Sequence, residues 1–422
     1  MVLAVAAFLV VLALIATERV HYTKVVLVGA AAVVLGGAIS QDEAIAAIDF
    51  NAIGLLAGMM VLVHVTQQSG VYDYVAIRAG QIARGNPFWL VMSLAGLTTL
   101  LSAFLPNLTI ILLIVPITFL LADTLDIDPV PVILIEVVVS NIGGTATLIG
   151  DPPNAIIGGA AGLSFDQFIF NVAPIAAISF VVVAGSLYLV FRRSLQVPER
   201  NRRYVMELDA QASIEDPEEM RRTIPVLAGT VIAFFLSEPL DLQPATVALS
   251  GATAALLLTR QQLEEALSRI EWATLFFLLG LFVMVGALEQ TDAIDDVADA
   301  IEDVTGGDRA AHLLGMLWFS GFASGLIDNI PVTAAMVPVI PDLQASAGAQ
   351  GDDAYWWALA LGTGFGGNAT IVASAANIAA AGVASRAGRT ITFLDFLRVG
   401  LPVTAVTLGL ATAYVTIRYI VI

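Results

Sequence analysis

Two polar motifs inside otherwise apolar stretches are the part of this sequence best suited to ion coordination. The first is SNIGGTATLIGDPPN at Ser140–Asn154, and the second is GTGFGGNATIVASAAN at Gly362–Asn377. Glycine and proline pairs inside an apolar helix are costly and predict a break in it. A break frees backbone carbonyls on one side and amides on the other, which together with Asn and Thr side chains can coordinate an ion.

Two further polar positions break apolar runs where too little chain is left for an ordinary loop. Pro106-Asn107 breaks the first run, and Asp328-Asn329 breaks the second. Each break predicts a re-entrant hairpin whose tip is buried in protein, because irregular backbone is not tolerated against lipid. A buried amide needs several hydrogen-bond partners, so we favour a binding role for the Asn residues at both tips.

The candidate ion- or substrate-binding residues lie on these four segments. In the first half they are Asn107, Thr109, Ser140, Asn141, Gly144, Thr145, Thr147, Asp151 and Asn154. In the second half they are Asp328, Asn329, Thr333, Thr363, Gly367, Asn368, Thr370 and Asn377. A sodium ion would take oxygen ligands from Asn107, Asn141, Asn329 and Asn368. The alternative for the Gly, Ser and Thr residues is close helix packing without any role in binding.

The carboxylates in these segments need compensation, because an ionised one at this depth costs about 2.5–3.5 kcal/mol on insertion scales. Asp151 precedes Pro152-Pro153, so it could cap the next helix as well as handle an ion. Asp328 has no such local role, and we expect it to carry the proton or cation. Glu136, one turn before Ser140, is a further candidate that could instead face cytoplasmic water.

Neither the tips nor the breaks contain Lys or Arg. A multiply charged anion would usually need one, so their absence favours cation exchange, or a neutral substrate exchanged for protons. The preference is modest because helix N-termini can hold anions without a basic residue.

The elements that must position these residues are membrane helices. The chain has 422 residues, of which 58% are hydrophobic and 13% charged, and its mean hydropathy is +0.88. A soluble domain has about 25% charged residues, so the composition excludes an ordinary soluble enzyme. The net charge of −18 argues against nucleic-acid binding, and the absence of cysteine excludes disulfides and thiolate metal sites.

The two halves of the chain match at a nearly constant offset. Ile48-Asp49-Phe50 corresponds to Ile270-Glu271-Trp272, 222 positions later, and Gly143–Thr147 corresponds to Gly366–Thr370 at an offset of 223. Each half is predicted to cross the membrane five times, because a re-entrant hairpin adds no net crossing. Five is an odd number, so the two copies have opposite orientations. The sequence therefore predicts an all-α polytopic membrane protein of two inverted-topology repeats. Each repeat contains one re-entrant hairpin and one broken transmembrane helix, with the site at the midplane between the repeats.

The predicted domains are a first repeat at 1–191, a cytoplasmic linker at 192–222 and a second repeat at 223–422. Loop charge sets the orientation, because Lys and Arg accumulate on the cytoplasmic side. With both termini outside, all of the 18 basic residues except Arg309 and Arg418 lie on the cytoplasmic side. We therefore expect a multi-pass protein of the cell membrane.

Nearly the whole chain resembles the ion transporter superfamily, in its arsenite-permease/NhaD-type branch, which includes the melanosomal P protein and is related to the divalent anion–sodium symporters. GGTATLIGDPPN at Gly143–Asn154 is the most specific motif. SGLIDNIPVTAAMVPV at Ser324–Val339 and GGNATIVASAAN at Gly366–Asn377 support it. The resemblance implies transport-site residues at Asn107, Thr109, Asn141, Thr145, Asp328, Asn329, Asn368 and Thr370.

The resemblance also implies a homodimer that works by an elevator mechanism. A scaffold, about residues 1–68 and 223–288, would hold a mobile transport domain, about residues 88–191 and 310–422. The family often has Asp-Asn at the first tip, where this chain has Pro106-Asn107. One ion site would then be missing unless Asp151 replaces the lost carboxylate.

Members of this superfamily expel arsenite, exchange sodium for protons, or import carboxylates. We therefore expect a secondary active transporter, coupled to protons or sodium, for arsenite or antimonite efflux or for sodium–proton exchange. Its partners would be the bilayer and a small inorganic ion or small anion, plus an ATPase subunit if the substrate is arsenite. We expect no cofactor other than bound Na+ or H+.

Two alternatives use the same fold: a sodium-coupled carboxylate or anion symporter, and a passive ion channel. An intramembrane aspartyl protease is disfavoured, because Leu148 stands where a Gly-x-Gly-Asp signature needs its first glycine. The absence of a P-loop argues against an ATP-driven pump.

Overall fold

The computed structural model describes residues 2–421 except 17–18, 199–200, 292–293, 295, 297–298, 300 and 303–304. Within this part of the chain the secondary structure is helical, without a β-strand, as predicted. The helices of the first half are α1 (Val2–Ala16), α2 (Tyr22–Leu35), α3 (Gln41–Ala46), α4 (Phe50–Gln67), α5 (Val71–Ile82), α6 (Pro87–Ser102), α7 (Asn107–Leu125), α8 (Val130–Thr145), α9 (Pro152–Ala161), α10 (Phe165–Asn171) and α11 (Ala173–Phe191).

The connection between the halves contains α12 (Arg202–Glu207) and a 3₁₀ turn, η1 (Ala210–Ser213). The helices of the second half are α13 (Pro217–Phe235), α14 (Pro244–Leu258), α15 (Leu263–Ser268), α16 (Trp272–Glu289), α18 (Arg309–Leu326), α19 (Asn329–Met336), η2 (Val337–Val339), α20 (Ile340–Ser346), α21 (Ala354–Gly366), α22 (Ala375–Arg386) and α23 (Phe393–Val415), with a π-helical end, η3 (Thr416–Val421). Helix α13 begins at Pro217, inside the segment predicted as linker.

The internal repeat predicted from the sequence is visible in the helix boundaries and in matched contacts. Helices α4 and α16 both have 18 residues and begin 222 positions apart. The Thr23 hydroxyl donates to Ala273 O at 2.9 Å, and the Ala245 amide donates to Asn51 Oδ1 at 2.9 Å. The second bond joins the positions that correspond to those of the first. The second helix of each repeat, α2 or α14, therefore makes an equivalent contact with a helix of the other repeat, α16 or α4.

Two glycines allow these helices to cross closely. Helix α14 crosses α4 at Gly58, where a Cβ would lie 2.7 Å from the Ala248 carbonyl carbon. Helix α2 crosses α16 at Gly280, the position that matches Gly58, where a Cβ would lie 2.9 Å from Val26 Cγ1. Any larger residue would have to push the helices apart.

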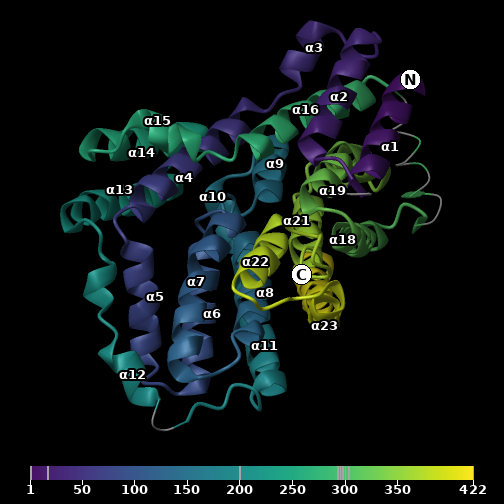
Figure 1. Cartoon of the computed structure of the whole chain (residues 1–422). Helices are drawn as coiled ribbons and strands as arrows, with labels where there is room; N and C mark the ends of the chain where they lie inside the picture. The colour runs from purple at the N-terminus through teal and green to yellow at the C-terminus, as the bar shows by residue number, and fades with distance from the viewer. Residues whose placement is uncertain are drawn as a thin grey trace.

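The remaining membrane helices pack in a second group that also joins the halves. Helices α6 and α11 pack on α8, and the matching helices α18 and α23 pack on α21. Across the halves, α21 contacts α8 and α9, α19 contacts α9, and α22 contacts α7. Figure 1 shows α5, α6, α7, α8 and α11 running side by side in the lower half of the view, below α4, α13, α14 and α15. The assignment of these groups to a scaffold and a mobile domain concerns motion and stays a prediction.

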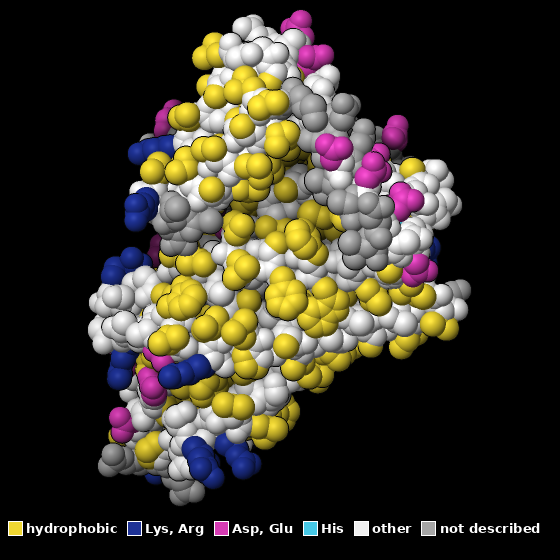
Figure 2. All heavy atoms as spheres, turned by 90° about the vertical axis from the view of Figure 1, so that its right-hand side faces the viewer, with side chains coloured by type: hydrophobic (Ala, Val, Ile, Leu, Met, Phe, Trp, Pro, Cys, Tyr) yellow, Lys and Arg dark blue, Asp and Glu magenta, His cyan; other side chains and the backbone are white. Residues whose placement is uncertain are grey.

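The surface and helix lengths fit a membrane environment. Within the described part of the chain, five helices are long and apolar enough to cross a bilayer by length and composition: α4, α7, α11, α16 and the continuous Phe393–Val421. Figure 2 shows a broad face of hydrophobic side chains, with Lys and Arg at its left and lower edges, and Asp and Glu mostly toward the upper right, with a few more at the lower left. The orientation was predicted from the distribution of Lys and Arg along the sequence, and it stays a prediction.

The predicted elements were membrane-spanning helices only, so four shorter helices of the first half and its connection were not predicted: α3, α5, α10 and α12. Helix α5 packs on α6 and α7, and its Gln81 side chain donates to Leu208 O in the connection at 2.7 Å. The connection is also held at Asn201, whose amide donates to Leu125 O at the end of α7 at 3.2 Å. The segment between the repeats therefore lies against the first half and does not hang free.

Candidate functional site

The candidate site lies where each hairpin tip meets the broken helix of its own repeat. Asn107 is the first residue of α7, is 4% exposed and accepts a hydrogen bond from the Ser102 hydroxyl. A Cβ on Gly144 would lie 2.5 Å from Asn107 Oδ1. In the second repeat, Asn329 is the first residue of α19, and a Cβ on Gly367 would lie 3.7 Å from Asn329 Nδ2. The glycine of each break therefore lies beside the Asn of the tip.

Matched asparagines hold the two breaks open. Asn154 Nδ2 donates to the carbonyl oxygens of Gly144, Thr145 and Thr147, at 3.2, 3.0 and 2.7 Å. Asn377 Nδ2 donates to the carbonyl oxygens of Gly367 and Thr370, both at 2.8 Å. The carbonyls of Gly144 and Thr147 match those of Gly367 and Thr370. Each side chain thus satisfies carbonyls that lost their helical partners.

Matched threonines tie each break to its hairpin tip. The Thr147 hydroxyl donates to Ala103 O, and the Thr370 hydroxyl donates to Gly325 O at 2.8 Å. Both pairs join equivalent positions of the two repeats. These two predicted residues therefore position the site through backbone contacts.

The two repeats are joined at the site by side-chain hydrogen bonds. Asn141 Nδ2 donates to Asn368 Oδ1 and to Asn377 Oδ1, both at 3.0 Å, and the Ser374 hydroxyl donates to Asn141 Oδ1 at 3.2 Å. Asn329 Nδ2 donates to Asp151 Oδ2 at 2.9 Å. The structure therefore brings together predicted residues that are about half the chain apart in sequence.

A cavity of about 290 Å³ opens onto the tips and breaks. Four of the predicted residues line it: Asn107, Asp151, Asp328 and Asn329. Its walls come from both repeats and include residues of α4, α16 and the start of α2. Among the described residues its lining contains three carboxylates, the third being Glu271, and neither Lys nor Arg. The cavity is therefore acidic and open to a cation, and it has polar groups from both hairpins on its wall.

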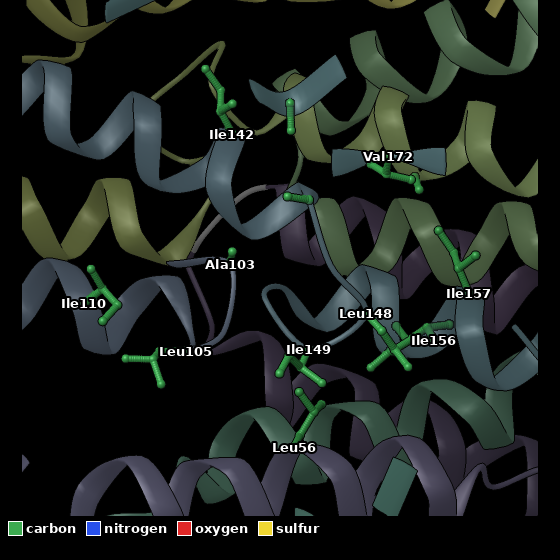
Figure 3. Packing of buried hydrophobic residues seen from close by; sticks show 14 of the residues in the cluster. Leu56, Ala103, Leu105, Ile110, Ile142, Leu148, Ile149, Ile156, Ile157 and Val172 are labelled. Atoms are coloured by element: carbon green, nitrogen blue, oxygen red, sulfur yellow. The ribbon is translucent and has the colours of Figure 1, made fainter. Parts of the chain in front are cut away.

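Apolar side chains surround these polar groups and form much of the cavity wall. Figure 3 shows Leu105 and Ala103 on the loop of the first hairpin, and Ile149 of the first break above Leu56 of α4. Ile149 and Leu56 also line the cavity. Low-dielectric walls of this kind strengthen the interaction between an ion and the few polar groups that face it.

The structure reverses the expected capping roles of the two aspartates. Asp151 stands at the N-cap position of α9, but its side chain makes no cap hydrogen bond and accepts from Asn329 instead. Asp328, which we expected to have no local role, caps α19 by accepting from the Ile330 amide at 3.0 Å. The reason is that the tip of the second hairpin lies beside the first break, so Asp151 finds a partner there.

The expectation that Glu136 could face cytoplasmic water is wrong. Glu136 is fully buried, and its Oε1 accepts from the Thr118 hydroxyl at 2.6 Å. Its Oε2 is buried without a hydrogen-bond partner among the described residues. Helix α7 covers this face of α8, which the linear sequence did not indicate.

Several predicted hydroxyls bond to their own helix and do not point at the cavity. Ser140 donates to Val137 O, Thr145 to Asn141 O, Thr333 to Asn329 O, and Thr363 to Leu359 O, at 2.8–2.9 Å. Thr109, like these four residues, is absent from the cavity wall. These five positions fit the packing alternative better than direct binding.

Two amide groups at the site have unused hydrogen-bonding capacity. Asn107 Nδ2 and Asn368 Nδ2 are buried and have no partner among the described residues. An unpaired buried donor costs about 1–3 kcal/mol, so a ligand oxygen at these positions would remove a penalty. The amide of Asn107 lines the cavity, so it is a candidate donor to a ligand oxygen, whereas Asn368 lies behind the cavity wall.

Sequence reasoning missed the part of the cavity wall that comes from α2 and α16. Glu271, Thr274, Tyr22 and His21 line the cavity. The signal for Glu271 was present, because the repeat alignment pairs it with Asp49 and keeps a carboxylate at both positions. Nothing in the sequence alone indicates that the start of α2 reaches the same cavity.

The family comparison places this geometry among known transporters. The citrate transporter family, CitMHS, matches residues 12–362. An uncharacterized transporter of Mycobacterium tuberculosis is 41% identical over 426 residues, covering 100% of this chain and 99% of that protein. The P protein of Sus scrofa is 30% identical, covering 97% of this chain and 58% of that protein. The fold is similar to the crystal structure of the Alcanivorax borkumensis YdaH transporter, with a TM-score of 0.61 at 15% identity, over 87% of this chain and 85% of that one.

Proposed function

This chain belongs to the citrate transporter family, and we propose that it moves a small ion by secondary active transport coupled to protons or sodium. As a member of that family it is a multi-pass membrane transporter and not an enzyme. Its narrower placement in the arsenite-permease/NhaD-type branch stays a prediction. The observation that carries the proposal is one acidic cavity lined by Asn107, Asp151, Asp328 and Asn329 from both repeats.

Sodium–proton exchange is the activity that we propose first. The cavity presents carboxylates and amides without a basic residue, and hard cations prefer such oxygen ligands. A carboxylate that binds either a proton or Na+, but not both, exchanges one for the other. Asp328 and Asp151 are the proposed exchange sites, and Asn107 and Asn329 would supply amide oxygens to the Na+. Movement of the hairpins and breaks relative to α4 and α16 would expose this site to each side in turn.

Carboxylate transport is the second candidate function. The family name specifies citrate, and the unpartnered donors Asn107 Nδ2 and Asn368 Nδ2 suit carboxylate oxygens. In this case the acidic residues of the cavity would hold the coupling cations beside the anion. Arsenite or antimonite efflux remains a third candidate, supported by the sequence resemblance alone.

Counterflow into proteoliposomes tests these candidates directly. Purified protein would be reconstituted and offered Na+, Li+, citrate, smaller dicarboxylates, arsenite and antimonite in turn, with internal pH followed by an entrapped dye. Sodium–proton exchange predicts alkalinisation or acidification that follows an imposed Na+ gradient. Flux of Na+ without coupled proton movement would contradict it, and would support a passive channel if the reversal potential followed Na+ alone.

The variant Asp328→Asn is the matched test of the exchange site. Asn is as good an N-cap residue as Asp, so the variant keeps the α19 cap and loses only the titratable charge. We expect coupled flux to be lost while thermal stability is retained. Coupled flux at the unsubstituted rate would remove Asp328 from the mechanism.

A further inference from the structure

Asp49 and Glu271 occupy equivalent positions of the two repeats. They lie at opposite ends of the helix pair formed by α4 and α16. Each is the residue before the helix that faces the site, Asp49 before α4 and Glu271 before α16. Helix α16 has 18 residues, which at about 1.5 Å per residue is roughly 27 Å. The start of α4 lies near the far end of α16, because Asp49 and Glu289 line one small cavity. The two acids therefore stand on opposite sides of the site.

On the Glu271 side the structure is open. The cavity of about 290 Å³ runs from Glu271 to Asn107, Asp151, Asp328 and Asn329. Glu271 makes no side-chain hydrogen bond to the first amides of α16. Its carboxylate accepts from the Thr274 hydroxyl, at 3.4 Å.

On the Asp49 side the same region is closed. Asp49 Oδ1 caps α4 by accepting from the amides of Asn51 at 2.8 Å and Ala52 at 3.0 Å. The second cavity, of about 210 Å³, is lined by Asp49 and Glu289 but by neither tip residue, Asn107 nor Asn329.

A matched pair of glycines shows the same difference. On the closed side Gly159 of α9 abuts the Asp49 carboxylate so tightly that an added Cβ would collide with it. Its equivalent on the open side is Gly382 of α22, where the nearest atom to an added Cβ is Arg386 Nη1 at 4.0 Å. The contact between broken helix and capping acid is thus made in one repeat and absent from the other. Since the repeats are equivalent, the absent contact is available for the opposite state.

We propose that Asp49 and Glu271 are a pair of gate carboxylates that exchange roles as the site opens to one side and then the other. The acid on the closed side caps its helix and packs against the broken helix. The acid on the open side leaves the cap, turns into the cavity and attracts a monovalent cation toward the tips. The destination of the cation is the pair of carboxylates Asp151 and Asp328, which line the same cavity as Glu271. The inference rests on the proposed function, because it describes how that site is reached.

The two gates are unequal in a way that explains which side is open here. Aspartate is a strong N-cap residue, whereas glutamate is not among the preferred ones. Closing the Asp49 side therefore gains a good cap, and closing the Glu271 side gains a weaker one. A conformational equilibrium responds to such a difference by a shift in population. Changing the caps should shift that population without any change at the tips.

Single-cysteine labelling tests the proposal, because the chain has no cysteine of its own. The open-side reporter is Thr274→Cys, which places a thiol on the open cavity. The closed-side reporter is Ala52→Cys, at the equivalent position of the closed side, where Ala52 is 1% exposed. A membrane-impermeant maleimide is applied to protein in nanodiscs, which exposes both faces. We expect the open-side reporter to react quickly and the closed-side reporter slowly.

The gate variants are then added to each reporter. Asp49→Ala removes the cap and should raise labelling of the closed-side reporter and lower that of the open-side reporter. The ratio of the two labelling rates should change about fivefold, which is the effect of one typical N-cap on a two-state equilibrium. Glu271→Asp supplies a better cap on the open side and should lower labelling of the open-side reporter. Asp49→Asn keeps the cap, so its labelling should match the unsubstituted background. Thermal unfolding confirms that each variant is folded.

The outcomes separate this inference from the proposed function. Equal labelling of Asp49→Ala and Asp49→Asn, or a closed-side reporter that reacts faster than the open-side one in the unsubstituted background, would overturn the gate. A shift in labelling with no Na+ or proton flux in proteoliposomes would leave the gate standing and contradict sodium–proton exchange. Coupled flux of Na+ and protons, together with labelling that is unchanged in every cap variant, would support sodium–proton exchange and contradict the gate.

Discussion

Replacing Asn154 with alanine should destabilise the first break more than any other single amide deletion away from the cavity. The side chain donates to the carbonyls of Gly144, Thr145 and Thr147. Among the described residues only the Thr147 carbonyl keeps another donor when the side chain is removed, the Gly150 amide at 3.4 Å. Side-chain hydrogen bonds between membrane helices average about 0.6 kcal/mol each. The two hydrogens of the amide are shared among three carbonyls and give a loss of about 1 kcal/mol, and the buried carbonyls left unpaired raise it toward about 2 kcal/mol.

The assay is thermal unfolding in lipid nanodiscs, followed by the fluorescence of the chain's five tryptophans. The control is Asn201→Ala, which removes a buried amide that makes one hydrogen bond, to Leu125 O. We expect the midpoint to fall about twice as far for Asn154→Ala as for Asn201→Ala, because the Asn154 amide uses both of its hydrogens. Asn377→Ala, the same change in the second break, should resemble Asn154→Ala. Equal small shifts for Asn154→Ala and Asn201→Ala would refute the reasoning that these amides hold the breaks open.

Three further predictions concern the tips and α8. Gly144→Ala should abolish transport, because its Cβ would lie 2.5 Å from Asn107 Oδ1. Gly367→Ala should keep most of the transport activity, because its Cβ would lie 3.4 Å from its nearest neighbour. Initial flux rates in proteoliposomes measure both, and equal rates would contradict the prediction. Glu136→Leu removes a buried Oε2 without a partner among the described residues and also the hydrogen bond from the Thr118 hydroxyl to Oε1. Because a buried unpaired polar group is costly, we expect the unfolding midpoint to stay or rise. A fall of several degrees would assign the carboxyl a structural role. Asp328→Ala loses the α19 cap that Asp328→Asn keeps. Its free energy of unfolding should therefore be about 1 kcal/mol lower than that of Asp328→Asn, and its unfolding midpoint lower. Equal midpoints would contradict the cap.

The sequence predicted the fold well because the repeat and the apolar runs are strong signals. The offset of 222 between Phe50 and Trp272 reappears in the starts of α4 and α16, and both broken helices end and restart inside the predicted motifs. Short helices such as α5 were missed, because a search for spans of about 20 apolar residues does not detect amphipathic segments of 6–12 residues.

The site was predicted less completely because its contacts are made between distant segments. The four predicted cavity residues come from motifs that the sequence marks clearly. The roles of Asp151 and Asp328 could not be assigned, because local spacing predicts a cap at Asp151, whereas the second hairpin supplies it with a partner, Asn329. Glu271 was missed because it stands outside the motifs, at a helix start that only the tertiary structure brings to the cavity.

The central claim is that the two repeats build one site, and the Asp151–Asn329 hydrogen bond is its most direct test. The two residues would be exchanged in the double variant Asp151→Asn/Asn329→Asp and compared with each single variant by thermal unfolding in nanodiscs. The account predicts that the double variant regains an amide–carboxylate bond. Its loss of stability should therefore be smaller than the sum of the losses in the two single variants, by about 0.5–3 kcal/mol. Single effects that add to within about 0.5 kcal/mol would show that the residues do not touch, and would contradict a site shared by both repeats.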